Sequence, residues 1–246
     1  MTFYDAHTHR PTADCALAVL NSAEPGDWAR VAAQAASDPR LIPSYGLHPW
    51  YCADAPAGWL AQLRAHLLEN PRAQVGEIGL DRHMPRHLPP TPIEQQLAAF
   101  TPQLALAAEL GRVATIHCTR AHGLLLDVLR ATKPLPRLLL HAYSGSAELV
   151  KDFASLGACF SFGAGQLAPQ RTRARAAARA VPPERLLVET DMPKETAADA
   201  PNAPQQLETP RPDLAQGYRT LAELRDEPFA LFAERIGINF RQLFPQ

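Results

Sequence analysis

Short apolar runs alternate with helix-length stretches along almost the whole chain, and this alternation constrains the fold more than any other feature. Eight runs of apolar and β-branched residues are candidate strands, at 2–7, 16–21, 41–46, 74–79, 112–117, 137–141, 158–162 and 186–190. Segments with helical spacing lie at 28–36, 59–68, 93–110, 147–156 and 170–180, with two more inside 213–243. Such alternation favours parallel strands with helices outside them, most simply in a closed barrel. We therefore predict an α/β fold, specifically a (β/α)8 TIM-type barrel.

The first connection departs from this pattern. Only residues 8–15 separate the first two candidate strands, and Pro11 lies among them. A crossover helix between parallel strands needs about a dozen residues. We therefore expect a barrel distorted by a shortened first β–α connection, unless the second strand lies elsewhere. No repeat or linker interrupts the 246 residues, a length typical of one such barrel, so we expect a single domain over 1–246.

Charge and cysteine content narrow the function classes. The chain has 24 basic and 25 acidic residues, a net charge of −1, and so has no global field for long nucleic acid or an anionic membrane. Contact with nucleic acid would have to be local. The four cysteines form no C-x-x-C pair, and neither a signal peptide nor a membrane-spanning apolar run is evident. We expect a cytoplasmic protein that needs no obligate protein partner.

Metal-type ligands lie at the end of the first candidate strand, in the sequence Asp5-Ala6-His7-Thr8-His9. In an extended chain, residues i and i+2 share a face, so His7 and His9 can bind one metal ion through imidazole nitrogens. Asp5 lies on the same face and could orient a histidine from behind. Because H-x-H alone is common, chance is an equal explanation at this point.

Repetition of the pattern at later strands favours metal binding over chance. Four later strands also end in a histidine or carboxylate, at Glu77, His117, His141 and Asp191. The carboxyl ends of parallel barrel strands meet at one face, where barrel enzymes place their active sites. These nitrogen and oxygen donors suit two divalent ions, with zinc, magnesium or manganese as candidates. A carboxylate bridging two ions is typical of phosphoester hydrolysis, in which Asp191 could take a proton from the attacking water.

The ordered motifs DAHTH, GLHPW, GEIGLD, TIHC, HAYSG and ETDMP resemble those of the TatD family of metal-dependent deoxyribonucleases, in the amidohydrolase superfamily. The resemblance runs from Asp5 to Pro193 and resumes in the closing NFRQLF. It implies a distorted barrel that cleaves phosphodiester bonds in a 3′ to 5′ direction, with DNA 3′ ends or short oligonucleotides as substrate.

The resemblance also implies roles for individual residues. His7, His9, Glu77 and Asp191 would hold one metal, and Glu77, His117 and His141 the other. Glu77 and Asp191 would thus be the catalytic carboxylates.

Two further positions match residues on the substrate side. His48 is similar to a histidine near the phosphate, although it could equally fix the turn before Pro49. Ser144 matches a small-residue turn that shapes the backbone or contacts substrate.

Some positions depart from the family pattern. Thr119 stands where the family has arginine, and Ala142-Tyr143 stand where it has Cys-Phe. These changes affect substrate contacts and no metal ligand. The same centre could therefore hydrolyse a small-molecule amide, lactone or phosphoester, and a non-catalytic binding barrel is a third alternative. The proline-rich segments 85–92 and 193–212 follow strands and could form walls of the site.

Overall fold

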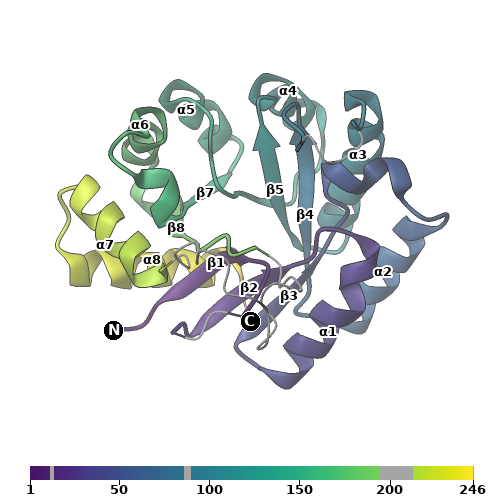
Figure 1. Cartoon of the computed structure of the whole chain (residues 1–246), viewed down its shortest axis with the longest axis horizontal. Helices are drawn as coiled ribbons and strands as arrows, with labels where there is room; N and C mark the ends of the chain where they lie inside the picture. The colour runs from purple at the N-terminus through teal and green to yellow at the C-terminus, as the bar shows by residue number, and fades with distance from the viewer. Residues whose placement is uncertain (12–13, 86–89, 194–212, 246) are drawn as a thin grey trace, which may run out of the picture.

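The strands form one parallel sheet in sequence order, β1 to β8, in a computed structural model that describes residues 1–11, 14–85, 90–193 and 213–245 (Figure 1). All eight coincide with the predicted runs to within a few residues. Their bounds are β1 Tyr4–Thr8, β2 Leu17–Asn21, β3 Leu41–Tyr45, β4 Gln74–Asp81, β5 Val113–Thr119, β6 Arg137–Leu140, β7 Cys159–Phe162 and β8 Leu186–Val188. The predicted α/β barrel is thereby confirmed.

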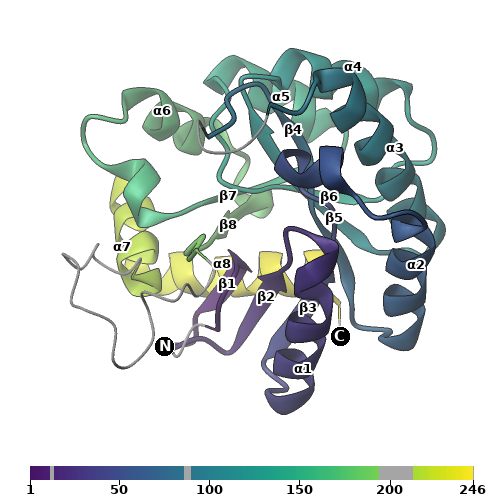
Figure 2. The same ribbon diagram turned by 45° about the vertical axis from the view of Figure 1, so that its right-hand side comes forward.

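Most of the helices lie outside the strands (Figure 2). The helices are α1 Trp28–Ser37, α2 Trp59–Glu69, α3 Ile93–Glu109, α4 His122–Ala131, α5 Ala147–Ser155, α6 Thr172–Ala180, α7 Leu214–Leu224 and α8 Phe229–Leu243. Four 3₁₀ turns are η1 Pro25–Asp27, η2 Pro49–Asp54, η3 Ala164–Leu167 and η4 Pro183–Arg185. Helix α4 was not predicted from the sequence. Its buried residues Leu125, Leu126 and Leu129 have helical spacing, but the unbroken run of leucines hides that period.

The described part of the first connection contains no helix, as the short spacing predicts. β1 and β2 are direct neighbours, and their register shifts between Asp5 and Thr8. The segments predicted as possible walls of the site lie largely outside the described residues, at 86–89 and 194–212.

Backbone bonds beyond the last strand join the two edges of the sheet. The Asp191 amide donates to the His7 carbonyl over 3.0 Å, and the His9 amide donates to the Met192 carbonyl over 2.9 Å. Asp5 adds a side-chain link, because its carboxylate accepts from the Thr190 amide at 3.0 Å and hydroxyl at 2.7 Å. The barrel is therefore drawn together at the end where the predicted ligands lie.

The interior of the barrel is filled by apolar side chains, and α8 contributes to it. Phe240 packs on Tyr4 with ring centroids 5.0 Å apart. Buried residues of this inner cluster are Tyr4, Ala6, Val19, Ile42, Val113, Leu139, Cys159, Leu187, Phe240, Leu243 and Phe244. Several of them begin their strands, so the end of α8 packs against the end of the barrel opposite the ligands. The strand ends at the other side are left for polar chemistry.

One glycine lets two ligand-bearing strands approach each other. Gly79 in β4 has a φ of +147°, and a Cβ atom there would lie 1.9 Å from the carbonyl oxygen of His117 in β5. No other residue type fits this position without moving a strand. The close approach places Glu77 and His117 next to each other.

Candidate metal centre

Glu77, almost fully buried on β4, lies at the centre of the predicted ligands. Its Oε2 atom is 3.0 Å from His9 Nε2 and 3.6 Å from His7 Nε2. Its Oε1 atom is 2.7 Å from His141 Nε2 and 3.0 Å from His117 Nδ1. Each oxygen of one carboxylate thus faces its own pair of histidines.

Asp191 joins the group on the Oε2 side. Its Oδ1 atom is 3.5 Å from His7 Nε2, and His7 Nε2 is 3.3 Å from His9 Nε2. His7, His9 and Asp191 offer ligand atoms close enough to hold one ion, as do His7, Glu77 and His141. All six residues that the sequence predicts as metal ligands are therefore brought together, from β1, β4, β5 and the segments after β1, β6 and β8.

The histidine tautomers indicate where a cation would sit. His9 Nδ1 lies 3.0 Å from the carbonyl oxygen of Asn21, which only accepts hydrogen bonds. Nδ1 therefore carries the proton, and neutral His9 directs the lone pair of Nε2 at Glu77. Two acceptors 3.0 Å apart repel each other unless a proton or a metal ion lies between them.

The electrostatics of the cluster also call for positive charge. Burial alone would raise the pKa of Glu77, but His141, His48 and His117 outweigh it and hold that pKa well below its ordinary value. Burial likewise favours neutral His117, yet hydrogen bonds to Asp81 and Glu77 raise its pKa to about 10. Without metal, the two carboxylates thus keep an extra proton on His117. A divalent cation would replace that proton, so the donor set fits a metal centre.

His48 lies inside this cluster, with Nε2 3.3 Å from Glu77 Oε1. Its Nδ1 accepts the amide proton of Trp50 over 3.2 Å, so the proton of the neutral ring is on Nε2. Burial lowers the pKa of His48 to about 4, which keeps the ring neutral near pH 7. His48, Glu77 and His117 are close enough to form a ligand group, but an N–H pointing inward makes His48 a hydrogen-bond donor.

The other predicted site residues lie around the cluster. The Asp5 carboxylate accepts hydrogen bonds from Thr190 and from the His7 amide, so it braces β1 against the segment that carries Asp191. Ser144 is exposed, and its hydroxyl donates to the Cys118 carbonyl at the end of β5.

The departures from the family pattern have local effects. Thr119 Oγ1 lies 3.2 Å from His117 Nε2. Tyr143 is buried, and its hydroxyl donates to the Ser146 carbonyl. A Cβ atom at Gly145 would lie 2.3 Å from that hydroxyl, so the tyrosine itself requires glycine there.

Three strand ends at this face carry residues in the left-handed backbone region. Arg120 follows β5 with a φ of 54°, Ala142 follows β6 with 43°, and Asp191 follows β8 with 47°. Non-glycine residues rarely adopt this conformation, and such strain gathers at functional sites. At Ala142 a hydrogen bond accompanies this backbone conformation, because its amide donates to Glu189 Oε1 over 2.7 Å.

From sequence alone Asp81 could equally cap a loop or support a metal ligand, and Trp50 had no predicted role. The Asp81 carboxylate accepts a hydrogen bond from the Trp50 indole over 2.7 Å and lies 3.0 Å from His117 Nε2. The only sequence signal was the position of Asp81 on the same candidate strand end as Glu77, four residues later. An even spacing in a strand favours side chains on the same face.

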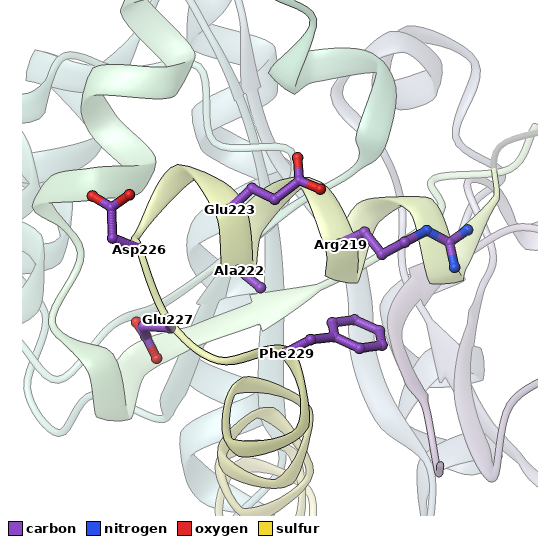
Figure 3. A pocket seen from close by; sticks show the side chains of 6 residues that line it. All are labelled: Arg219, Ala222, Glu223, Asp226, Glu227 and Phe229. Carbon is purple, nitrogen blue, oxygen red and sulfur yellow. The ribbon is translucent and has the colours of Figure 1, made fainter.

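A separate concavity of about 560 Å³ lies at the junction of α7 and α8 (Figure 3). Its lining residues are Arg219, Ala222, Glu223, Asp226, Glu227 and Phe229. None belongs to a strand end, and two arginines already neutralise Glu227. This concavity is therefore separate from the cluster around Glu77.

Comparison with known proteins identifies the family of this chain. The chain matches the TatD related DNase family over residues 6–245. The chain belongs to the TatD family. It is 31% identical over 209 residues to the 3′-5′ ssDNA/RNA exonuclease TatD of Pantoea ananatis, covering 81% of this chain and 76% of that one. It is 27% identical to an uncharacterized metal-dependent hydrolase of Haemophilus influenzae, over 99% of this chain and 100% of the other.

Solved structures of TatD proteins share the fold. YJJV, a TatD homologue from Escherichia coli k12, superposes with a TM-score of 0.82 at 27% identity, covering 99% of this chain and 98% of the other. A TatD family hydrolase from Entamoeba histolytica gives a TM-score of 0.76 at 17% identity over 94% and 85% of the two chains, which shows the fold alone.

Proposed function

We propose that this TatD family member is a metal-dependent deoxyribonuclease with a two-metal centre, which removes nucleotides from DNA 3′ ends or short oligonucleotides. One observation carries the proposal: the two carboxylate oxygens of Glu77 face separate groups of donors. A bridging carboxylate of this kind holds two ions close together, as in-line phosphoryl displacement requires. The names of the relatives supply the substrate class and the 3′ to 5′ polarity.

The proposed ligands are His7, His9 and Asp191 on the Oε2 side of Glu77, and His117 and His141 on the Oε1 side. Zinc, magnesium and manganese all accept such donors, and the residues do not choose among them. When bound, two divalent ions would lower the pKa of a water molecule and stabilise negative charge on the phosphoryl oxygens.

The chain's own groups supply the proton chemistry and the contacts with substrate. Asp191 Oδ1 takes the proton of the attacking water. Burial would raise the pKa of Asp191, but its bond with His7 and the charge of His141 lower it, so the carboxylate is ionised near pH 7. His48 donates its Nε2–H to a phosphate oxygen of the substrate, in place of its present contact with Glu77. Ser144 is placed at the rim for a second contact.

Further features support the setting of this activity. All four cysteines are free, which suits the reducing cytoplasm that we propose as its location. No described helix is long and apolar enough to cross a membrane. Parallel strand pairing from β1 to β8, with α8 packed into the same barrel core, supports one domain over 1–246.

The test is cleavage of an end-labelled single-stranded DNA with Mg²⁺, Mn²⁺ or Zn²⁺ added to metal-stripped protein. We expect a metal-dependent ladder that shortens from the 3′ end. Asp191→Asn should abolish it, while Asp152→Asn, the same change at a surface carboxylate that pairs with Arg130, should not.

Absence of cleavage with every metal, or full activity in Asp191→Asn, would contradict the nuclease proposal. A panel of small amides, lactones and phosphoesters run beside the DNA tests the alternative substrates. That alternative is favoured by Thr119, which puts a short uncharged side chain where the family has arginine.

A further inference from the structure

Asp81 receives hydrogen bonds from three separate parts of the chain. It is almost fully buried at the end of β4. Its Oδ2 atom accepts from the indole nitrogen of Trp50 at 2.7 Å and lies 3.0 Å from His117 Nε2, while Oδ1 accepts from the His83 amide at 2.5 Å. This carboxylate therefore connects His117, a proposed metal ligand, to the side chain of Trp50.

The direction of the bond to His117 follows from chemistry. The Trp50 indole and the His83 amide only donate, so Asp81 acts as an ionised acceptor. His117 therefore donates from Nε2, so the Nδ1 proton is the one that a metal ion would replace, which leaves a neutral ring with its lone pair at Nδ1. That atom points to Glu77 Oε1, 3.0 Å away. Asp81 thus selects the tautomer that binds metal through Nδ1.

The backbone of Asp81 is itself held firmly. Gln96, buried on α3, accepts from the Asp81 amide at 2.7 Å and donates to the Asp81 carbonyl at 2.8 Å. Two turns later, Gln103 makes the same pair of bonds to Leu47, next to His48. One helix face therefore fixes both segments that meet at Asp81.

Trp50 is placed beside the proposed substrate donor. Its ring lies edge to face with that of His48 at 4.7 Å between centroids, and 6.1 Å from that of His117. The indole is half-buried, so part of it remains accessible. Its bond to Asp81 fixes the orientation of this wall.

We propose that Asp81 is a positioning residue that fixes His117 as an Nδ1 metal ligand and Trp50 as a wall of the substrate site. This inference rests on the proposed metal centre. Removing the Asp81 carboxylate and removing the Trp50 indole N–H should therefore have different consequences. Loss of the carboxylate disturbs metal and wall together, whereas loss of the indole N–H disturbs the wall alone.

The experiment compares Asp81→Asn with Trp50→Phe by titrating metal-stripped protein with Mn²⁺ in a calorimeter. Loss of a partner behind a metal ligand lowers metal affinity by roughly 10–100-fold. We expect Asp81→Asn to weaken one of two Mn²⁺ sites by that factor. Trp50→Phe should leave both affinities within about twofold, because His117 keeps its acceptor. On oligonucleotide substrate, Trp50→Phe should raise KM more than it lowers kcat.

Unchanged Mn²⁺ affinities in folded Asp81→Asn would overturn the inference. If the wild-type protein binds no Mn²⁺, the proposed metal centre itself fails, which is a separate outcome. Nitrogen-15 NMR of the imidazoles in zinc-loaded wild-type protein gives a readout that needs no variant. It should find His117 protonated at Nε2 and ligated at Nδ1, and the opposite tautomer would refute the role of Asp81.

Discussion

Replacing Glu77 with glutamine is the sharpest perturbation of the proposed centre, because it changes charge with little change in shape. The residue is 3% exposed, so water screens it poorly. At an effective dielectric constant of about 20, two unit charges about 3 Å apart interact by roughly 5 kcal/mol. About 1.4 kcal/mol corresponds to tenfold in affinity. We therefore expect Glu77→Gln to weaken divalent metal binding by on the order of a thousandfold or more.

The amide also places an NH₂ group where a carboxylate oxygen now faces histidine nitrogens, so one of the two donor groups loses its shared oxygen. The assay is calorimetric titration of metal-stripped protein with Mn²⁺, with circular dichroism to establish folding. Glu109→Gln, an exposed glutamate paired with Arg64, is the matched control and should bind as wild type. Two Mn²⁺ ions bound to folded Glu77→Gln with native affinity would refute the bridging role.

Three further predictions concern the frame around the centre. Phe240→Ala removes a fully buried ring from the barrel interior and should cost about 3–5 kcal/mol of unfolding free energy in urea titrations; a loss under about 1 kcal/mol would contradict the packing. Gly79→Ala places a methyl group against the His117 carbonyl and should cost about 4 kcal/mol or more in the same assay, so native stability would disprove the strand approach. In metal-free protein, the folded-state pKa of His117, about 10, exceeds its unfolded value, so its stabilising effect is full below pH about 6.5 and is lost as pH rises through about 10. Thermal melts from pH 7 to 10 should show this loss in wild type and less of it in His117→Gln, and equal slopes would argue against the pairing.

Sequence alone predicted most of the fold because each strand carries its own local signal. The strands begin and end near the expected residues, and the short first connection is read directly from the spacing of 2–7 and 16–21. The ligands were predictable for a related reason. Parallel strands in a barrel deliver their carboxyl ends to one face, so histidines and carboxylates at those ends had to meet.

Long-range hydrogen bonds could not be read in the same way. Asp81 and Trp50 are 31 residues apart, and nothing in GLHPW or GEIGLD indicates that an indole and a carboxylate meet. The link from Asp5 to Thr190 spans 185 residues and depends on barrel closure. The tautomer of His48 depends on a backbone amide of the following turn, so its donor role required coordinates.

The most direct test of the account is anomalous diffraction from crystals soaked in Mn²⁺ or Zn²⁺. The account predicts two peaks that flank Glu77. One should lie near Oε2 among His7, His9 and Asp191, and the other near Oε1 between His117 Nδ1 and His141 Nε2. A single peak away from Glu77, or an ion ligated by His48, would contradict the proposed two-metal centre.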